Sequence, residues 1–281
     1  MRLNNGTIGI LVWLAVMLIG TLGAFRDNGR LVDAGSPARN SLRRPPPLPA
    51  TTAVLPAPSP SDPSFTVETS PQGNSSGTAF ALGGERWMTA RHVVDGCDST
   101  GLLTSPRRGI RAGAVALHPG ADLAIIRVPL SAPPVRISGT PLYIGQDGYH
   151  FGYPRGEPGA VRSQLIGRRV MRSGRRGKAE PVIAWAEVER MPDGDTPLSG
   201  MSGGPVFNAA GQLIGVSVAA SVRRGRIMTA TPATIQDMLE RAVVTPATDG
   251  VSPRLAPATF ATAGDQLRSD RTVSKVICIV N

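Results

Sequence analysis

The sequence predicts an all-β fold, either a sandwich or a barrel, behind an N-terminal apolar segment. From Phe65 onward, short runs rich in β-branched residues alternate with clusters of Gly, Pro, Asp and Asn. The 281 residues are 41% hydrophobic, which suffices for a packed core and excludes global disorder. The 2 cysteines exclude a disulfide-dense scaffold and a four-cysteine zinc site.

Residues 1–26 contain an uncharged apolar run, Ile8–Phe25, whose length approaches the thickness of a bilayer core. Two interpretations stay open, a cleaved signal peptide and an uncleaved anchor. Leu22 stands where a signal-peptide cleavage site needs a small residue, which favours the transmembrane anchor. We expect a membrane-anchored, extracytoplasmic (periplasmic) domain, with secretion after cleavage as the alternative. The charges that flank the apolar run do not themselves settle its orientation.

Residues 27–64 form a proline-rich linker, in which Arg43–Pro47 and Ala57–Pro60 are the densest stretches. Proline fixes φ and removes the amide donor, so we expect an extended spacer without helix or sheet. A plain tether is the simpler interpretation, and a ligand for a proline-recognition module is the other.

The expected strands share short length and β-branched or aromatic content. They are 78–82, 87–90, 112–117, 123–128, 161–166, 182–189, 212–219 and 226–229. A helix follows over 231–242, with Thr231 as N-cap and Pro232 at the first helical position.

Three residues carry the candidate chemistry. His92 lies just past a strand, and histidine takes and returns protons near neutral pH. Asp122 precedes the apolar strand 123–128, where a buried acid needs a partner such as a histidine N–H. Ser202 lies among glycines that allow a tight turn with converging N–H groups, as an oxyanion requires.

These segments resemble the trypsin-like serine peptidases of the chymotrypsin fold, and bacterial HtrA-type members in particular. The run TARHVVDG is similar to the histidine motif of that family, ADLAIIRV to its aspartate motif, and GMSGGPVFNAAGQLIGV to its serine motif. The resemblance covers roughly 65–242. It implies two antiparallel six-stranded β-barrels, at about 65–135 and 141–230, followed by the helix 231–242.

The resemblance also implies a mechanism. Ser202 attacks a peptide carbonyl, His92 transfers the proton, and Asp122 orients the imidazole. The N–H groups of Gly200 and Ser202 form the oxyanion hole. The implied specificity pocket has uncharged walls and therefore favours small or medium apolar P1 residues; its residues are Thr196, Ser217, Val218 and Ala219. His118 and His150 are expected to be bystanders.

The sequence departs from the family in two places. Met201 precedes the serine where digestive trypsins carry an aspartate, so zymogen cleavage is not expected to activate the enzyme. HtrA-type enzymes also carry a PDZ domain, for which the tail 243–281 is too short. The apolar end of this tail, Val276–Val280, could add an edge strand to the fold.

The two cysteines, Cys97 and Cys278, allow a disulfide that would pin the tail to the first barrel in an oxidising compartment. Two free buried thiols are the alternative.

The net charge of +10 is concentrated rather than spread. Residues 65–242 contain 20 Lys and Arg against 14 Asp and Glu, and one predicted surface hairpin accounts for the excess. Its bases are Arg168, Arg169, Arg172, Arg175, Arg176 and Lys178. A solvated loop, a lipid-headgroup contact and an acidic partner stay open. Nucleic acid is disfavoured because no aromatic residue lies between these bases.

The leading hypothesis is a membrane-tethered serine endopeptidase acting on proteins or peptides, with no cofactor and no metal. The rival is a catalytically silent module of the same fold that binds peptides or scaffolds a complex. The sequence leaves the natural substrate and the oligomeric state open.

Overall fold

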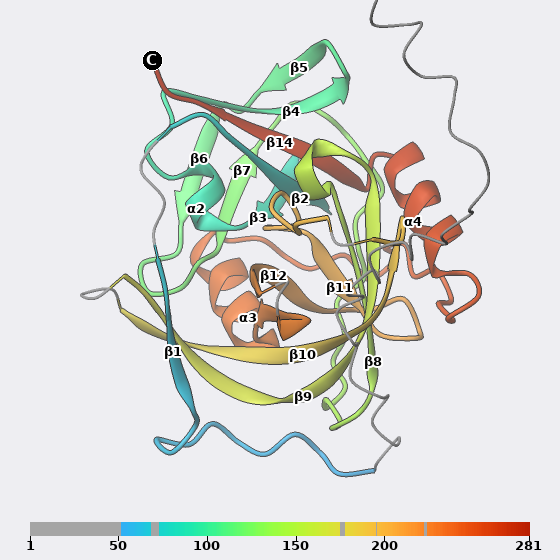
Figure 1. Ribbon diagram of the computed structural model, residues 1–281. Coiled ribbons are helices and arrows are strands. Elements are labelled where there is room, and N and C mark those ends of the chain that lie inside the picture. Colours follow the sequence, from blue (N-terminus) through green and yellow to red (C-terminus); the bar gives the residue numbers. More distant parts are fainter. Residues whose placement is uncertain (1–51, 69–72, 175–177, 195, 222–223) are drawn as a thin grey trace, which may run out of the picture. The chain divides into compact units, whose positions relative to one another are not determined.

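The computed structural model describes residues 52–68, 73–174, 178–194, 196–221 and 224–281 (Figure 1). The predicted membrane segment and most of the predicted linker lie outside these ranges. Within them, two β-sheets of seven strands each pack with three α-helices. None of the helices in these ranges is long and apolar enough to cross a membrane.

The first sheet, called here the open sheet, does not close into the predicted six-stranded barrel. Its outer strands β5 and β6 do not pair with each other in the described chain. The strands, in spatial order, are β5 (Arg108–Arg111), β4 (Ser99–Ser105), β14 (Val273–Ile279), β2 (Ser75–Gly83), β3 (Arg86–Thr89), β7 (Ala124–Arg127) and β6 (Ala114–Leu117).

The C-terminal strand β14 lies in the interior of the open sheet and not at the predicted edge. It pairs antiparallel with β2 on one side and β4 on the other, and Figure 1 shows it in red between these two strands. Val273, Val276 and Cys278 of β14 are buried, which explains why this apolar segment occupies a central position. Cys278 forms a disulfide with Cys97, with an S–S distance of 1.98 Å.

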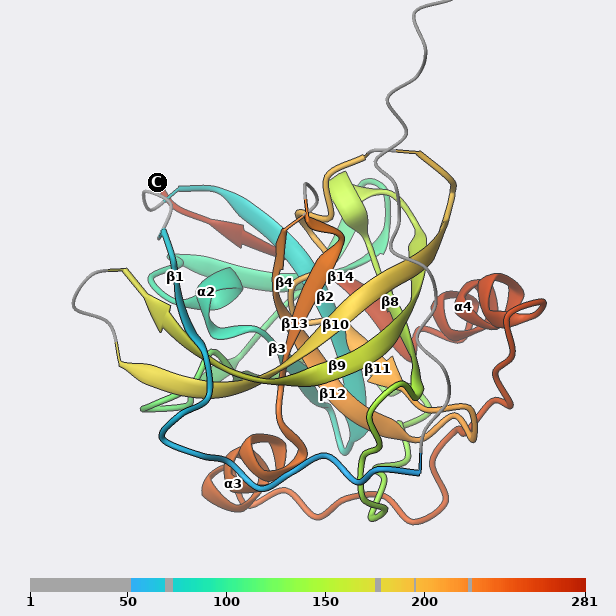
Figure 2. The ribbon, with the colours of Figure 1, turned by 60° about the horizontal axis from the view of Figure 1, so that its bottom comes forward.

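The second sheet contains a closed barrel of six strands, called here the closed barrel. It closes because β8 pairs with both β9 and β11. Its strands are β8 (Asp147–Gly152), β9 (Gly159–Ser173), β10 (Ala179–Met191), β13 (Arg226–Ala230), β12 (Leu213–Ser221) and β11 (Pro205–Phe207). One core cluster includes Leu165, Trp185 and Ile214. Figure 2 shows the long strands β9 and β10 curving across one side.

Strand β1 (Ser64–Val67) joins this sheet in parallel alongside β9, so the sheet is not wholly antiparallel. The preceding residues also contact the barrel. Leu55 is buried in its core, and Val54 forms a bridge with Tyr143. The end of the predicted linker is therefore packed on the domain. Proline prevents regular helix and sheet there, but it leaves neighbouring apolar side chains free to pack.

Three α-helices flank the sheets in the part of the chain that the structure describes. Helix α2 (Arg91–Val94) is a single turn after β3, and α3 (Pro232–Arg241) begins at the predicted N-cap, where the Thr231 side chain accepts the N–H of Thr234. A further helix, α4 (Phe260–Ser269), falls in the predicted tail. Only Phe260 and Leu267 are large buried apolar residues in α4, so its sequence periodicity is weak.

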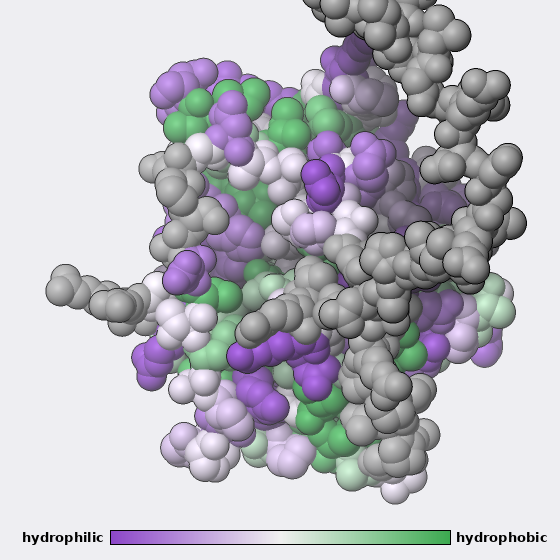
Figure 3. All heavy atoms as spheres, viewed as in Figure 1, coloured by the Kyte–Doolittle hydropathy of each residue, from purple (hydrophilic) through white to green (hydrophobic). Residues whose placement is uncertain are grey.

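The surface of the domain is mixed in character. Figure 3 shows hydrophilic and hydrophobic residues interspersed over the face seen in Figure 1.

The chain passes from the open sheet to the closed barrel between Arg127 and Asp147, the region where the sequence predicted the junction near 131–141.

Candidate active site

His92 is placed at the end of β3 by the single-turn helix α2. Val93 and Val94 of this turn are buried in the open-sheet core, which leaves the His92 side chain about half exposed (50%). Its position thus combines a fixed main chain with a ring that solvent and substrate can reach.

Asp122 lies two residues before β7, the neighbour of β3 in the open sheet. Its Oδ2 atom is 2.6 Å from Nδ1 of His92, and its Oδ1 atom accepts the main-chain N–H of His92 at 2.8 Å. The side chain is 10% exposed. The carboxylate therefore fixes both the ring and the main chain of His92, as the sequence predicted for a histidine–acid pair.

The electrostatics of this pair favour the protonated imidazole. Burial alone would lower the pKa of His92, but the hydrogen bond to Asp122 and the charges of Asp122 and Glu180 outweigh burial and raise that pKa. A histidine with a raised pKa holds a transferred proton more readily, which suits a general base that later acts as an acid.

Ser202 lies in a tight turn before β11 that packs against the start of α2. Gly203, at φ 84°, is essential to this packing, because a Cβ there would lie 2.1 Å from the Thr78 carbonyl oxygen and 2.7 Å from the Ala90 nitrogen. Ala90 is the N-cap residue of the turn that carries His92. The serine and histidine segments, far apart in sequence, thus meet at one place.

Two N–H groups near Ser202 are directed away from the protein's own acceptors. The carbonyl oxygens of Ser199 and Met201 each accept a main-chain N–H, at 2.6 and 2.9 Å. In a trans peptide the C=O and N–H bonds point in opposite directions. The N–H groups of Gly200 and Ser202 therefore point away from the residues that donate to these two carbonyl oxygens. Neither donates a hydrogen bond to any described residue.

The conformation of Gly200 requires glycine. Its φ is 97°, and a Cβ would lie 2.3 Å from the Tyr153 carbonyl oxygen. The hydroxyl of Thr78 donates to the Gly200 carbonyl oxygen at 2.7 Å and accepts the N–H of Tyr153 at 3.1 Å. Sequence reasoning assigned Thr78 only to a strand, because both partners are distant in the chain.

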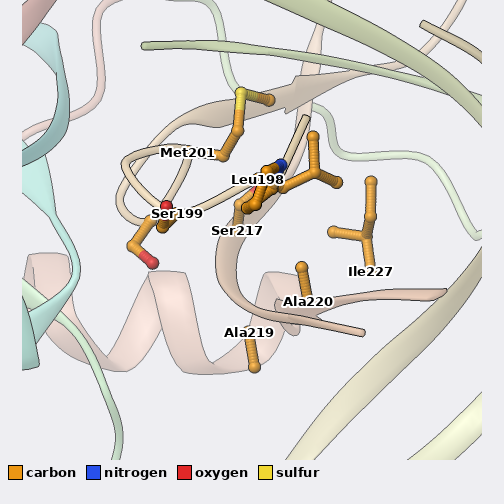
Figure 4. Close-up of a pocket in the computed structure, with 9 residues that line it drawn as sticks. Leu198, Ser199, Met201, Ser217, Ala219, Ala220 and Ile227 are labelled. Atoms are coloured by element: carbon orange, nitrogen blue, oxygen red, sulfur yellow. The ribbon is translucent and has the colours of Figure 1, made fainter. Parts of the chain in front are cut away.

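A pocket of about 240 Å³ adjoins Ser202 (Figure 4). Figure 4 shows the apolar side chains of Leu198 and Ile227 close together in it. Its lining residues are Pro197, Leu198, Ser199, Met201, Ser202, Ser217, Ala219, Ala220 and Ile227, all without charge. This lining is chemically suited to a small or medium apolar side chain.

Two residues predicted for the pocket lie elsewhere. Val218 is buried in a hydrophobic core cluster. Thr196 lines a neighbouring cavity, and its carbonyl oxygen accepts a hydrogen bond from Arg190. Ile227 closes the pocket instead, a residue that the sequence assigned to a strand only.

The other two histidines have partners of their own. His150 is fully buried in the closed barrel, where Ser163 and Ser217 contact its two nitrogens at 2.6 and 3.3 Å. Burial lowers the pKa of His150 to about 3, so the ring is neutral. His118 pairs with Asp237 of α3 at 2.7 Å.

The described members of the predicted basic loop lie mainly in strands. Arg168, Arg169 and Arg172 belong to β9, whereas Lys178 precedes β10, and Arg175 and Arg176 lie outside the described residues. The hairpin between Ser173 and Ala179 is where the sequence placed it. Arg168 and Lys178 donate to main-chain carbonyl oxygens.

A closed barrel, a curled open sheet, a histidine–aspartate pair and a serine in a glycine turn together define a serine peptidase-like domain. Residues 77–216 match the family described as the trypsin-like peptidase domain. The chain therefore carries a trypsin-like peptidase domain of the chymotrypsin fold.

Two known proteins similar to this chain are described as proteases. Serine protease Rv3671c of Mycobacterium tuberculosis is 31% identical over 154 residues, which are 52% of this chain and 36% of that protein. A probable periplasmic serine endoprotease DegP-like of Marinomonas sp. is 25% identical over 208 residues, 73% of this chain and 38% of that protein. The chain thus matches little more than a third of the length of these relatives.

The fold itself is also found in a solved structure. The crystal structure of the Rv3671c protease from M. tuberculosis in its active form superimposes with a TM-score of 0.51 at 22% identity. The match covers 71% of this chain and 99% of that one. At this identity the likeness concerns the fold alone.

Proposed function

We propose that this protein is a serine endopeptidase in which Ser202, His92 and Asp122 form the catalytic triad. One observation supports this proposal above all others. The Asp122 carboxylate holds His92 through both ring and main chain, while the glycine turn brings Ser202 against the same strand end. The alternative is a catalytically silent module that binds peptides. Such a module does not need Asp122 to hold both the ring and the main chain of His92.

The proposed mechanism is acyl transfer through a covalent acyl-enzyme. His92 removes the proton as Ser202 Oγ attacks the peptide carbonyl carbon, and Asp122 stabilises the imidazolium that results. The Gly200 and Ser202 N–H groups stabilise the oxyanion of the tetrahedral intermediate. Collapse of the intermediate breaks the C–N bond, and His92 delivers its proton to the leaving amine. Water then hydrolyses the acyl-enzyme by the same route.

The substrate proposal rests on the pocket beside Ser202. Its volume of about 240 Å³ and its uncharged lining support cleavage after small or medium apolar residues. The proposed setting is outside the cytoplasm, on a membrane tether formed by residues 1–26. The disulfide between Cys97 and Cys278 and the periplasmic designation of the DegP-like relative support an oxidising compartment.

Digestion of an unstructured protein such as casein by the full chain tests both the role of Ser202 and the specificity of the pocket. Mass spectrometry of the new termini should identify cuts after Ala, Val or similar residues, and Ser202→Ala should abolish them. Cleavage that persists in Ser202→Ala would contradict the assignment. Cuts concentrated after Arg, Lys or Glu would contradict the assignment of this pocket as the specificity pocket.

A further inference from the structure

Glu180 is a buried carboxylate that reaches the Asp122 segment from the other half of the molecule. It lies near the start of β10 in the closed barrel, whereas Asp122 precedes β7 in the open sheet. The Asp122 main-chain N–H donates to Glu180 Oε2 at 2.8 Å. Glu180 thus holds the main chain of the residue whose side chain holds His92.

The same end of β10 makes a second contact with this segment. The Lys178 ammonium donates to the Pro119 carbonyl oxygen at 3.2 Å. Two further groups hold the other end, since Arg91 donates to the His118 carbonyl oxygen and the His118 ring pairs with Asp237. The residues 118–122 are therefore fixed from both halves of the domain, and Glu180 holds the residue that orients His92.

The environment of Glu180 disfavours an ionised carboxylate. The residue is 4% exposed, and burial together with the Asp122 charge raises its pKa to about 7, although the Asp122 N–H bond and the His92 charge act in the opposite direction. Asp122 and His92 are the charged groups that bear on it most, and Lys178 lies two residues before it. A polar side chain at such a cost is expected to have a role beyond filling space.

We propose that Glu180 is a positioning residue of the triad, which fixes the Asp122 segment from the closed barrel and, when ionised, adds a second negative charge behind the His92–Asp122 pair. The inference rests on the proposed peptidase function. Glu180 acts through Asp122 and does not touch the substrate. Its carboxylate thereby makes the geometry of the His92–Asp122 pair, built on the open sheet, depend on the closed barrel that carries the specificity pocket.

Two substitutions separate the charge from the hydrogen bond. Glu180→Gln keeps an oxygen that can accept the Asp122 N–H but removes the charge, and Glu180→Ala removes both. Glu240→Gln is the matched control, because it makes the same chemical change at an exposed position of α3.

The first measurement is the pKa of His92, which is obtained from NMR of its ring across a range of pH. The full chains used for it also carry Ser202→Ala. No turnover is needed for this readout. We expect the pKa of His92 to fall in Glu180→Gln and in Glu180→Ala, because a nearby negative charge that favours imidazolium is lost. Glu240→Gln should leave it unchanged. An unchanged pKa of His92 in Glu180→Gln would overturn the proposal.

The second measurement is the rate at which a fluorophosphonate labels Ser202 in otherwise unmutated full chains, with folding checked by near-ultraviolet circular dichroism. Glu180→Ala should slow labelling by up to about 100-fold, the scale of a small misplacement in a catalytic group. Glu180→Gln should stay within a few-fold at alkaline pH. If folded Glu180→Ala labels as fast as wild type, Glu180 does not position the triad. If wild type itself fails to label while the pKa of His92 still responds to Glu180→Gln, the peptidase function fails and the electrostatic coupling stands.

Discussion

The main-chain N–H of Thr78 donates to the carbonyl oxygen of Ser202 at 2.8 Å. Thr78 belongs to β2 of the open sheet and is fully buried, and its hydroxyl bonds Gly200 at the same turn. One residue of the open sheet thus holds the main chain on both sides of the candidate nucleophile. The shape of the proposed oxyanion hole therefore depends on a contact between residues more than a hundred positions apart.

Replacement of Thr78 by valine should weaken both the turn and the reaction. Valine keeps the shape but removes the hydroxyl, which leaves the Gly200 carbonyl and the Tyr153 N–H without this partner. We expect the free energy of unfolding to fall by about 1–3 kcal/mol, the usual cost of a buried unpaired polar group. Ser202 labelling should also slow.

Urea unfolding and labelling rates check this prediction, with Thr66→Val as the control because Thr66 is exposed in β1. A Thr78→Val protein with wild-type stability and labelling rate would show that the hydroxyl is dispensable.

Replacement of Ala219 by valine should narrow the specificity pocket. Ala219 is partly exposed in the pocket wall, so added methyl groups project into the space that a substrate side chain would occupy. We expect kcat/KM for a Leu P1 peptide to fall by about 10–100-fold relative to an Ala P1 peptide, since single methylenes change binding in apolar pockets on this scale. Equal losses of kcat/KM for the two peptides would show that the P1 side chain does not bind in this pocket.

The stability of the domain should fall as pH rises through the range in which Glu180 titrates. Burial raises the pKa of Glu180 to about 7 from its ordinary value of 4.5, so between these values the folded state holds a proton that the unfolded state releases. His92, whose pKa is also raised, acts in the same direction, because its contribution is lost as pH rises through the folded pKa.

The Glu180 contribution reaches at most about 3 kcal/mol. Urea unfolding near pH 5 and near pH 8 should show a steeper loss for wild type than for Glu180→Gln. Parallel losses in the two proteins would contradict the assigned titration.

Loss of the disulfide should destabilise the open sheet. Cys97 and Cys278 are separated by 181 residues, and such a long crosslink restricts the unfolded chain strongly. We expect Cys97→Ser to lower the free energy of unfolding by about 2–5 kcal/mol. Reductant should destabilise wild type to a similar degree and leave Cys97→Ser unaffected. A reductant-insensitive wild type would contradict the crosslink.

The parts of the site that sequence predicted are those with local signals. His92, Asp122 and Ser202 each lie in a short motif whose residue types suit the chemistry, and the expected strands near 78–82 and 182–189 lie within β2 and β10. The Thr231 N-cap of α3 is equally local.

The parts that sequence reasoning missed depend on contacts between distant segments. The position of β14 between β2 and β4 is decided by pairing partners, and an apolar run predicts a strand without naming its neighbours. Thr78 and Glu180 are single residues whose hydrogen-bond partners lie in turns distant in the chain. Strand β11 is only three residues long, which gives no measurable alternation.

Intact mass analysis of the folded full chain after reaction with a fluorophosphonate tests whether Ser202 is the nucleophile of a working triad. We expect one covalent adduct that peptide mapping places on Ser202, no adduct in Ser202→Ala, and much slower reaction in His92→Ala. A folded chain that forms no adduct, or an adduct that persists in Ser202→Ala, would show that Ser202 is not the nucleophile.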